Sequence, residues 1–83
     1  MTIQWLAPVD AIALIRQAKA RGIKLLGFDA AYLRDGATQP SLEDSWDYTI
    51  AAYPPVPEVY GHAAIFIQER AAKGLFFEIV LAE

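Results

Sequence analysis

The stretch IKLLGFDAAYLRDGATQP, Ile23 to Pro40, decides the fold. Its first part is apolar and interrupted by a glycine, which is typical of an extended strand rather than a helix. The pair Asp35-Gly36 suits a two-residue hairpin turn, so the chain is expected to run back on itself from Ala37. Pro40 cannot donate a hydrogen bond to a neighbouring strand, which places the returning strand at a sheet edge or breaks it at that point.

A helix is predicted on each side of this hairpin. The first runs from Pro8 to Arg21, with proline in its first turn and Gly22 after its end, and the second runs from Pro57 to Lys73 before Gly74. Apolar residues recur at spacings of three and four in both segments, which predicts one buried stripe on each helix. The stripes consist of Val9, Ile12, Leu14, Ile15 and Ala18, and of Val59, Ala63, Phe66, Ile67 and Arg70.

The chain ends in the segment Leu75 to Leu81, which is apolar on both faces and therefore predicts a strand in the interior of a sheet. Between the hairpin and the second helix, Trp46, Tyr48 and Ile50 alternate with polar residues, as in a half-buried strand. The predicted order is α-β-β-(β)-α-β. We expect one α+β domain over residues 1–83, a two-layer sandwich with a mainly antiparallel sheet and two helices on one face.

Composition narrows the functional classes. The 83 residues are 55% hydrophobic and 20% charged, which is typical of a folded domain. Cysteine is absent, so disulfides and thiolate chemistry are excluded and a cytoplasmic location is expected. No segment reaches the ~18 uninterrupted apolar residues of a membrane span. The net charge of -3 disfavours nucleic acid and anionic membranes as partners.

The acids are concentrated in one part of the chain. Basic residues cluster early, whereas the segment from Asp29 to Glu58 holds six acids and Arg34 alone among bases. Within it, the run Gln39 to Ile50 combines three acids with a tryptophan and a tyrosine. Acids supply long-range attraction and aromatic residues supply the anchors of protein interfaces. This run therefore indicates a surface for a basic partner, although a solvated edge and buried aromatic residues are the simpler interpretation.

No catalytic constellation can be identified. His62 is the only histidine, so a multi-histidine metal site is excluded and an enzyme would need His62 brought against Asp29 or Glu43. Adjacent acids in a strand point to opposite faces, which argues against Glu43 and Asp44 lining one pocket unless a bulge intervenes. Glycine-rich phosphate loops are absent. We predict no catalytic residues, no metal and no cofactor.

The segment from Gly22 to Tyr48 resembles the central signature of the immunity protein 40 family, which consists of small bacterial immunity proteins. The residues that carry the resemblance are Gly22, Ile23, Leu26, Gly27, Asp29, Tyr32, the Asp35-Gly36 turn, Pro40, Trp46 and Tyr48. The layout of the whole chain fits, and about a third of it carries motif residues.

The resemblance implies a cytoplasmic, non-enzymatic antidote that binds a cognate toxin domain and blocks its active or target-binding site. The predicted partner-binding residues are Asp29, Tyr32, Glu43, Asp44, Trp46, Asp47 and Tyr48. A small-molecule-binding or regulatory domain, with a pocket between helix and sheet, is the alternative. The sequence leaves open whether the chain forms a homodimer.

Overall fold

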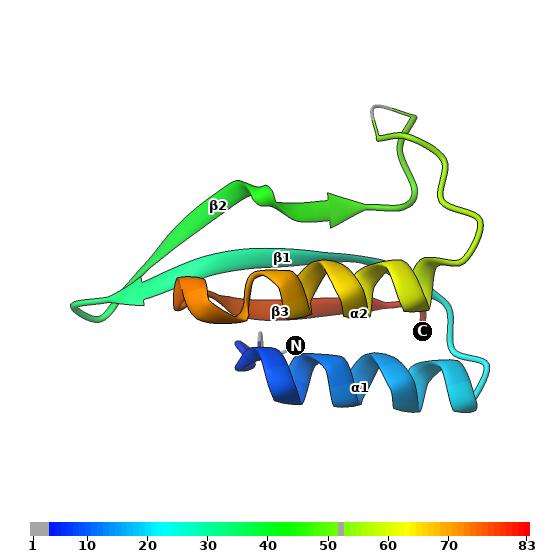
Figure 1. Ribbon diagram of the computed structural model, residues 1–83, viewed down its shortest axis with the longest axis horizontal. Helices are drawn as coiled ribbons and strands as arrows, with labels where there is room; N and C mark the ends of the chain where they lie inside the picture. The colour runs from blue at the N-terminus through cyan, green and yellow to red at the C-terminus, as the bar shows by residue number, and fades with distance from the viewer. Residues whose placement is uncertain (1–3, 52) are drawn as a thin grey trace.

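The structure is a computed structural model that describes residues 4–51 and 53–83. Its elements are α1 (Pro8–Ala20), β1 (Leu25–Arg34), β2 (Ala37–Asp47), α2 (Val59–Glu69), the short 3-10 turn η1 (Ala71–Lys73) and β3 (Phe76–Leu81). They form a three-stranded antiparallel sheet with two helices (Figure 1). The predicted α+β class and the order α-β-β-α-β are confirmed. The split of the returning arm into two strands is not seen, because β2 continues to Asp47.

The strand order is β2-β1-β3, so the prediction that Leu75–Leu81 forms an interior strand is wrong. β1 lies in the centre. β3 pairs with β1 on one side, and on its other side Phe77 forms a single bridge to Leu6 within the part of the chain that the structure describes. Both faces of β3 are apolar for separate reasons. Phe77 is fully buried against the helices, whereas Phe76 lies on the opposite face beside Ala31 of β1.

The predicted turn at the hairpin tip is confirmed. Asp35 and Gly36 have φ angles of 52° and 73°, and Arg34 pairs directly with Ala37. Two positive φ angles in succession define the turn type whose twist matches that of paired strands. Hydrogen-bonded and non-hydrogen-bonded pairs alternate along the two strands, and by this alternation Pro40 forms a non-hydrogen-bonded pair with Ala31. Its backbone nitrogen therefore points away from β1, where the missing N–H breaks no ladder hydrogen bond. The hairpin extends past the end of β3 (Figure 1).

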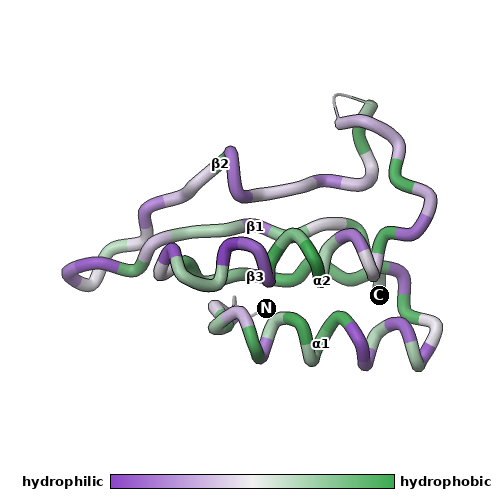
Figure 2. The backbone as a smooth tube through the Cα atoms, viewed as in Figure 1, coloured by the Kyte–Doolittle hydropathy of each residue, from purple (hydrophilic) through white to green (hydrophobic). Residues whose placement is uncertain are grey.

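The core lies between one face of the sheet and both helices. The hydropathy along the backbone agrees with this position, since α2 contains a long hydrophobic stretch and the hairpin tip is hydrophilic (Figure 2). The buried residues that form the core cluster are Ala11, Ile12, Ile15, Leu25, Phe28, Ala30, Ala63, Ile67, Leu75 and Phe77. The predicted stripe of α1 is correct at Ile12, Ile15 and Ala18, and Ala11 completes it. Val9 is 72% exposed and Leu14 is only partly buried, so these two predicted members lie outside the stripe.

The second helix is shorter than predicted. Glu58 is its N-cap, and the Glu58 carboxylate accepts hydrogen bonds from the N–H groups of Tyr60 and Gly61. The helix therefore begins at Val59, two residues after the predicted start at Pro57. The helix ends at Glu69, and Arg70 leaves the helical conformation before η1. Gly74, with a φ of 79°, then ends the turn as predicted. Within the described ranges, no helix is long and apolar enough to cross a membrane.

Candidate functional site

A bulge interrupts β2 in the middle of the acidic run. Phe28 pairs with Trp46, but Ala30 pairs with Ser41, so three residues of β2 have no counterpart on β1. The hydroxyl of Ser45 closes the gap. It accepts a hydrogen bond from the Ala30 N–H at 2.9 Å and donates one to the Ser41 carbonyl at 2.7 Å. A side chain thus replaces one rung of the backbone ladder.

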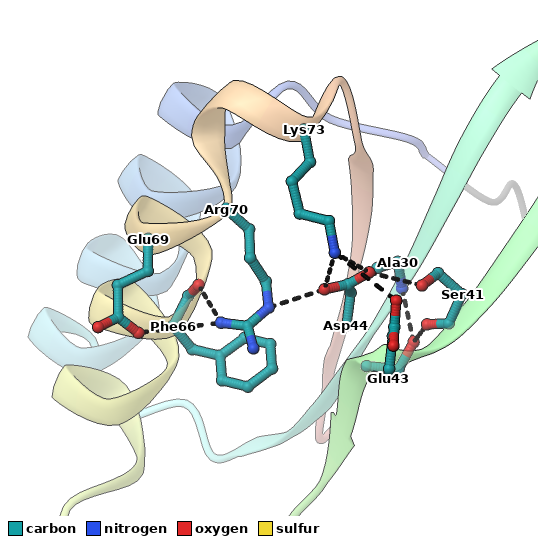
Figure 3. A network of polar contacts seen from close by, with 9 residues as sticks. Ala30, Ser41, Glu43, Asp44, Phe66, Glu69, Arg70 and Lys73 are labelled. Atoms are coloured by element: carbon teal, nitrogen blue, oxygen red, sulfur yellow. Dashed lines mark hydrogen bonds and ion pairs between the residues drawn. The ribbon is translucent and has the colours of Figure 1, made fainter.

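The bulge turns Asp44 inward. Its side chain is 2% exposed and meets Arg70 Nε at 2.8 Å and Lys73 Nζ at 2.9 Å, while the Ser41 hydroxyl donates to it at 2.6 Å (Figure 3). Burial raises the pKa of Asp44, but the hydrogen bonds from Ser41, Lys73 and Arg70 outweigh burial and hold it below the ordinary value. Asp44 therefore ties β2 to the end of α2 as a structural ion pair.

The face of the sheet that the helices leave uncovered carries a pair of carboxylates. Asp29 on β1 lies directly opposite Glu78 on β3, and both side chains leave the sheet on this face. Burial and the nearby Asp29 carboxylate raise the pKa of Glu78. Like charges in register cost a sheet stability. Among the described residues, no base forms an ion pair with either carboxylate.

A shallow hollow of about 190 Å³ extends this uncovered face toward the end of β2. Asp29 and Asp47 both line it, beside Gly27 and the exposed Val80. Gly27 is needed there because a Cβ atom at this position would lie 2.5 Å from the Trp46 carbonyl oxygen. The Asp47 carboxylate accepts hydrogen bonds from the hydroxyl and N–H of Thr49, which lower the pKa of Asp47 and keep it charged.

The aromatic residues of the run point to the helix layer. The ring of Trp46 lies 4.6 Å from that of His62, and the Tyr48 hydroxyl is 2.8 Å from His62 Nδ1. The indole N–H of Trp46 is buried without a hydrogen-bond partner among the described residues. Burial lowers the pKa of His62, although the Glu69 carboxylate opposes this shift, and burial also raises the pKa of Tyr48. The rings of these three residues pack against one another beside the core.

The lowered pKa of His62 predicts a pH dependence of stability. The folded chain binds the His62 proton less readily than the unfolded chain, so this contribution is complete above pH 6.5 and is lost as the pH falls below that value. We expect the free energy of unfolding to decline over this range by less in His62→Gln than in the wild type. Denaturant titrations of both proteins above and below pH 6.5 measure this decline in the free energy of unfolding. Glu78 acts with the opposite sign, so only the difference between the two proteins is diagnostic, and equal declines would contradict the prediction.

The predicted partner-binding residues fall into separate groups. Asp29 and Asp47 share the hollow on the uncovered face, whereas the side chain of Glu43 is 81% exposed and lies 3.7 Å from Lys73 at the bulge. The expectation that Asp44 is a surface residue is wrong, because the bulge buries it. Trp46, Tyr48 and Tyr32 pack against the core, and Arg34 covers the Tyr32 ring at 4.6 Å.

Glu78 was missed by the sequence analysis. It lies in the last strand, far along the chain from the acidic run, and joins Asp29 only through the pairing of β1 with β3.

Comparison with known proteins adds no family. No family model matches the chain, and no curated protein matches it.

Proposed function

We propose that this protein is an immunity protein that binds a basic toxin domain through the uncovered face of its sheet and thereby blocks the toxin's active or target-binding site. The binding surface consists of the carboxylates of Asp29, Asp47 and Glu78, with the exposed Val80 in the same hollow and Glu43 as a more distant charge. The protein acts in the cytoplasm of the toxin-producing cell, and it contributes no catalytic group.

The in-register pair of Asp29 and Glu78 carries this proposal. Two carboxylates side by side repel each other, and no base among the described residues forms an ion pair with either of them. An arginine of a partner, whose guanidinium can donate to both carboxylates, would relieve the repulsion. Binding would therefore recover the energy that the like-charged pair costs the free protein. This supports a basic protein as the partner.

The immunity part of the proposal rests on the sequence. The segment from Gly22 to Tyr48 resembles immunity proteins, and its motif residues have structural roles here. Gly27 permits the close approach of β1 to β2, Asp35 and Gly36 form the turn, and Pro40 protects an edge. Asp29, also a motif residue, is exposed on the uncovered face and forms no ion pair with a described residue.

The test uses the product of the adjacent reading frame as the candidate toxin. We expect the Asp29→Lys and Glu78→Lys variants to associate with it about tenfold more slowly than the wild type at low salt, because charge reversal removes the steering attraction. The difference should shrink at high salt, where charges more than about 8–10 Å apart are screened. Stopped-flow or surface-based kinetics at two salt concentrations measure both effects.

Asp10→Lys is the matched control, since it makes the same charge change on the exposed surface of α1. It should leave the association rate nearly unchanged. Each lysine variant places a positive charge opposite the remaining carboxylate, so both should stay folded, and circular dichroism verifies this. Unchanged kinetics in folded Asp29→Lys and Glu78→Lys proteins would exclude the uncovered face as the binding surface. Failure of the wild type to bind any toxin domain would exclude the immunity function.

A cavity favours the small-molecule alternative as a second candidate. It measures about 350 Å³ and lies between the end of β2 and the proline-rich segment of residues 53–57. Its lining includes Tyr48, Ile50, Tyr53, Val56 and Val59. This volume is at the lower end of the range for ligand pockets. A metabolite that raises the melting temperature of the wild type, but not of Tyr53→Ala, would support this function over toxin binding.

A further inference from the structure

The outer surface of the helix layer contains a continuous groove between α1 and α2. Two adjoining hollows of about 210 and 270 Å³ share Arg16, Ala64 and Ile65. Ile12 faces Gln68 at one end of the groove and Lys19 faces Tyr60 at the other, so the two helices run antiparallel, as Figure 1 shows.

Ile65 stands in the middle of this groove and is 63% exposed. Gly61 and Ala64 of α2 line the hollow beside it, which is open to a side chain from outside. The same surface therefore carries both a protruding aliphatic side chain and a hollow that could accept one. A surface that carries both can match a copy of itself.

The two ends of the groove also carry opposite charges. Glu69 lies at the end near Ile12, and Lys19 lies at the end near Tyr60. Glu69 is 3.8 Å from Arg70, a long contact for two partly exposed side chains, while Lys19 forms no ion pair with a described residue. A two-fold axis that crosses the groove between Ile65 and Gly61 would reverse the groove of the second copy. Each Ile65 would then face the partner's hollow, and each Glu69 would lie at the same end of the groove as the partner's Lys19.

We propose that a second copy of this chain docks in the groove, so that the protein forms a two-fold symmetric dimer through its helix layer. Ile65 of each copy fills the hollow beside Gly61 and Ala64 of the other. Two symmetric ion pairs, each between Glu69 of one copy and the partner's Lys19, set the antiparallel orientation of the two grooves. The uncovered sheet face lies on the opposite side and stays free, so the dimer does not depend on the proposed toxin binding.

Sedimentation equilibrium over micromolar to submillimolar concentrations tests the dimer, because its population depends on concentration. The wild type should dimerise, and Ile65→Asp should raise the dissociation constant at least about tenfold, as expected for the loss of a central apolar anchor. Lys19→Glu and Glu69→Lys should each weaken the dimer. The double variant Lys19→Glu/Glu69→Lys should restore it, because the swapped charges again face each other.

Leu42→Asp is the matched control, since Leu42 is an aliphatic side chain with 83% exposure on β2, away from the helix layer. It should dimerise as the wild type does. A wild type that is monomeric throughout the range, or a folded Ile65→Asp that dimerises normally, overturns the proposal. Weak dimers in both single charge variants and in the double variant overturn the two-fold arrangement.

Discussion

Replacing Phe28 with alanine is expected to lower the free energy of unfolding by about 3–5 kcal/mol. Phe28 is 1% exposed, and its ring lies 5.3 Å from Phe66 on α2, 6.1 Å from Phe77 on β3 and 6.2 Å from Tyr48. The side chain thus joins the helix layer to two parts of the sheet at one point. A domain of this length has a total stability of about 4–12 kcal/mol, so the variant should be partly unfolded at moderate temperature.

Urea denaturation followed by tryptophan fluorescence measures the loss, since Trp46 belongs to the same aromatic cluster. Phe76→Ala is the control. It makes the same substitution on the neighbouring strand, but Phe76 lies on the uncovered face and is only partly buried, so it should cost clearly less. Equal losses in the two variants would show that the uncovered face is as closely packed as the core, and would contradict this division of the sheet.

The sequence predicted the elements whose signals are local. The Asp35-Gly36 turn and the glycine after α1 act within a few residues, and the structure has them where they were expected. Gly74 also ends a turn, but that turn is η1 rather than α2. The predicted place of β3 in the sheet was wrong because a local pattern does not specify the neighbours of a strand. A strand that is apolar on both faces can lie in the interior, or it can lie at an edge with one face against the core and the other beside a neighbour such as Ala31.

The candidate site could be predicted only in part, because it depends on long-range pairing. Asp29 was identified from the sequence, but its neighbour Glu78 depends on the register of β1 with β3, which no local pattern encodes. The burial of Asp44 depends on the bulge of three residues. Period-two alternation assigns each residue of a strand to one face, and a bulge with an odd number of extra residues reverses that assignment after it.

The Asp44→Ala variant is expected to lose about 2–3 kcal/mol of stability. The Asp44 carboxylate binds two cations and one hydroxyl, and no other described acid approaches Arg70 Nε. The cost stays below that of a fully buried pair, because the side chains of Arg70 and Lys73 are 25% and 39% exposed and water can hydrate them after the substitution. Glu43→Ala is the control, and should cost at most about 0.5 kcal/mol, since the Glu43 carboxylate is exposed.

The pH dependence of this difference distinguishes charge from packing. The folded-state pKa of Asp44 lies below its ordinary value, so its contribution is complete above that value and disappears as the pH falls through the folded-state pKa. Chemical denaturation of the wild type and Asp44→Ala should therefore give a difference in the free energy of unfolding that disappears in acid. A difference of constant size would assign the effect to packing alone.

The bulge should also loosen without Asp44. The Ala30 amide, which donates to Ser45 within the bulge, should then exchange its hydrogen faster, while amides between β1 and β3 keep their relative protection.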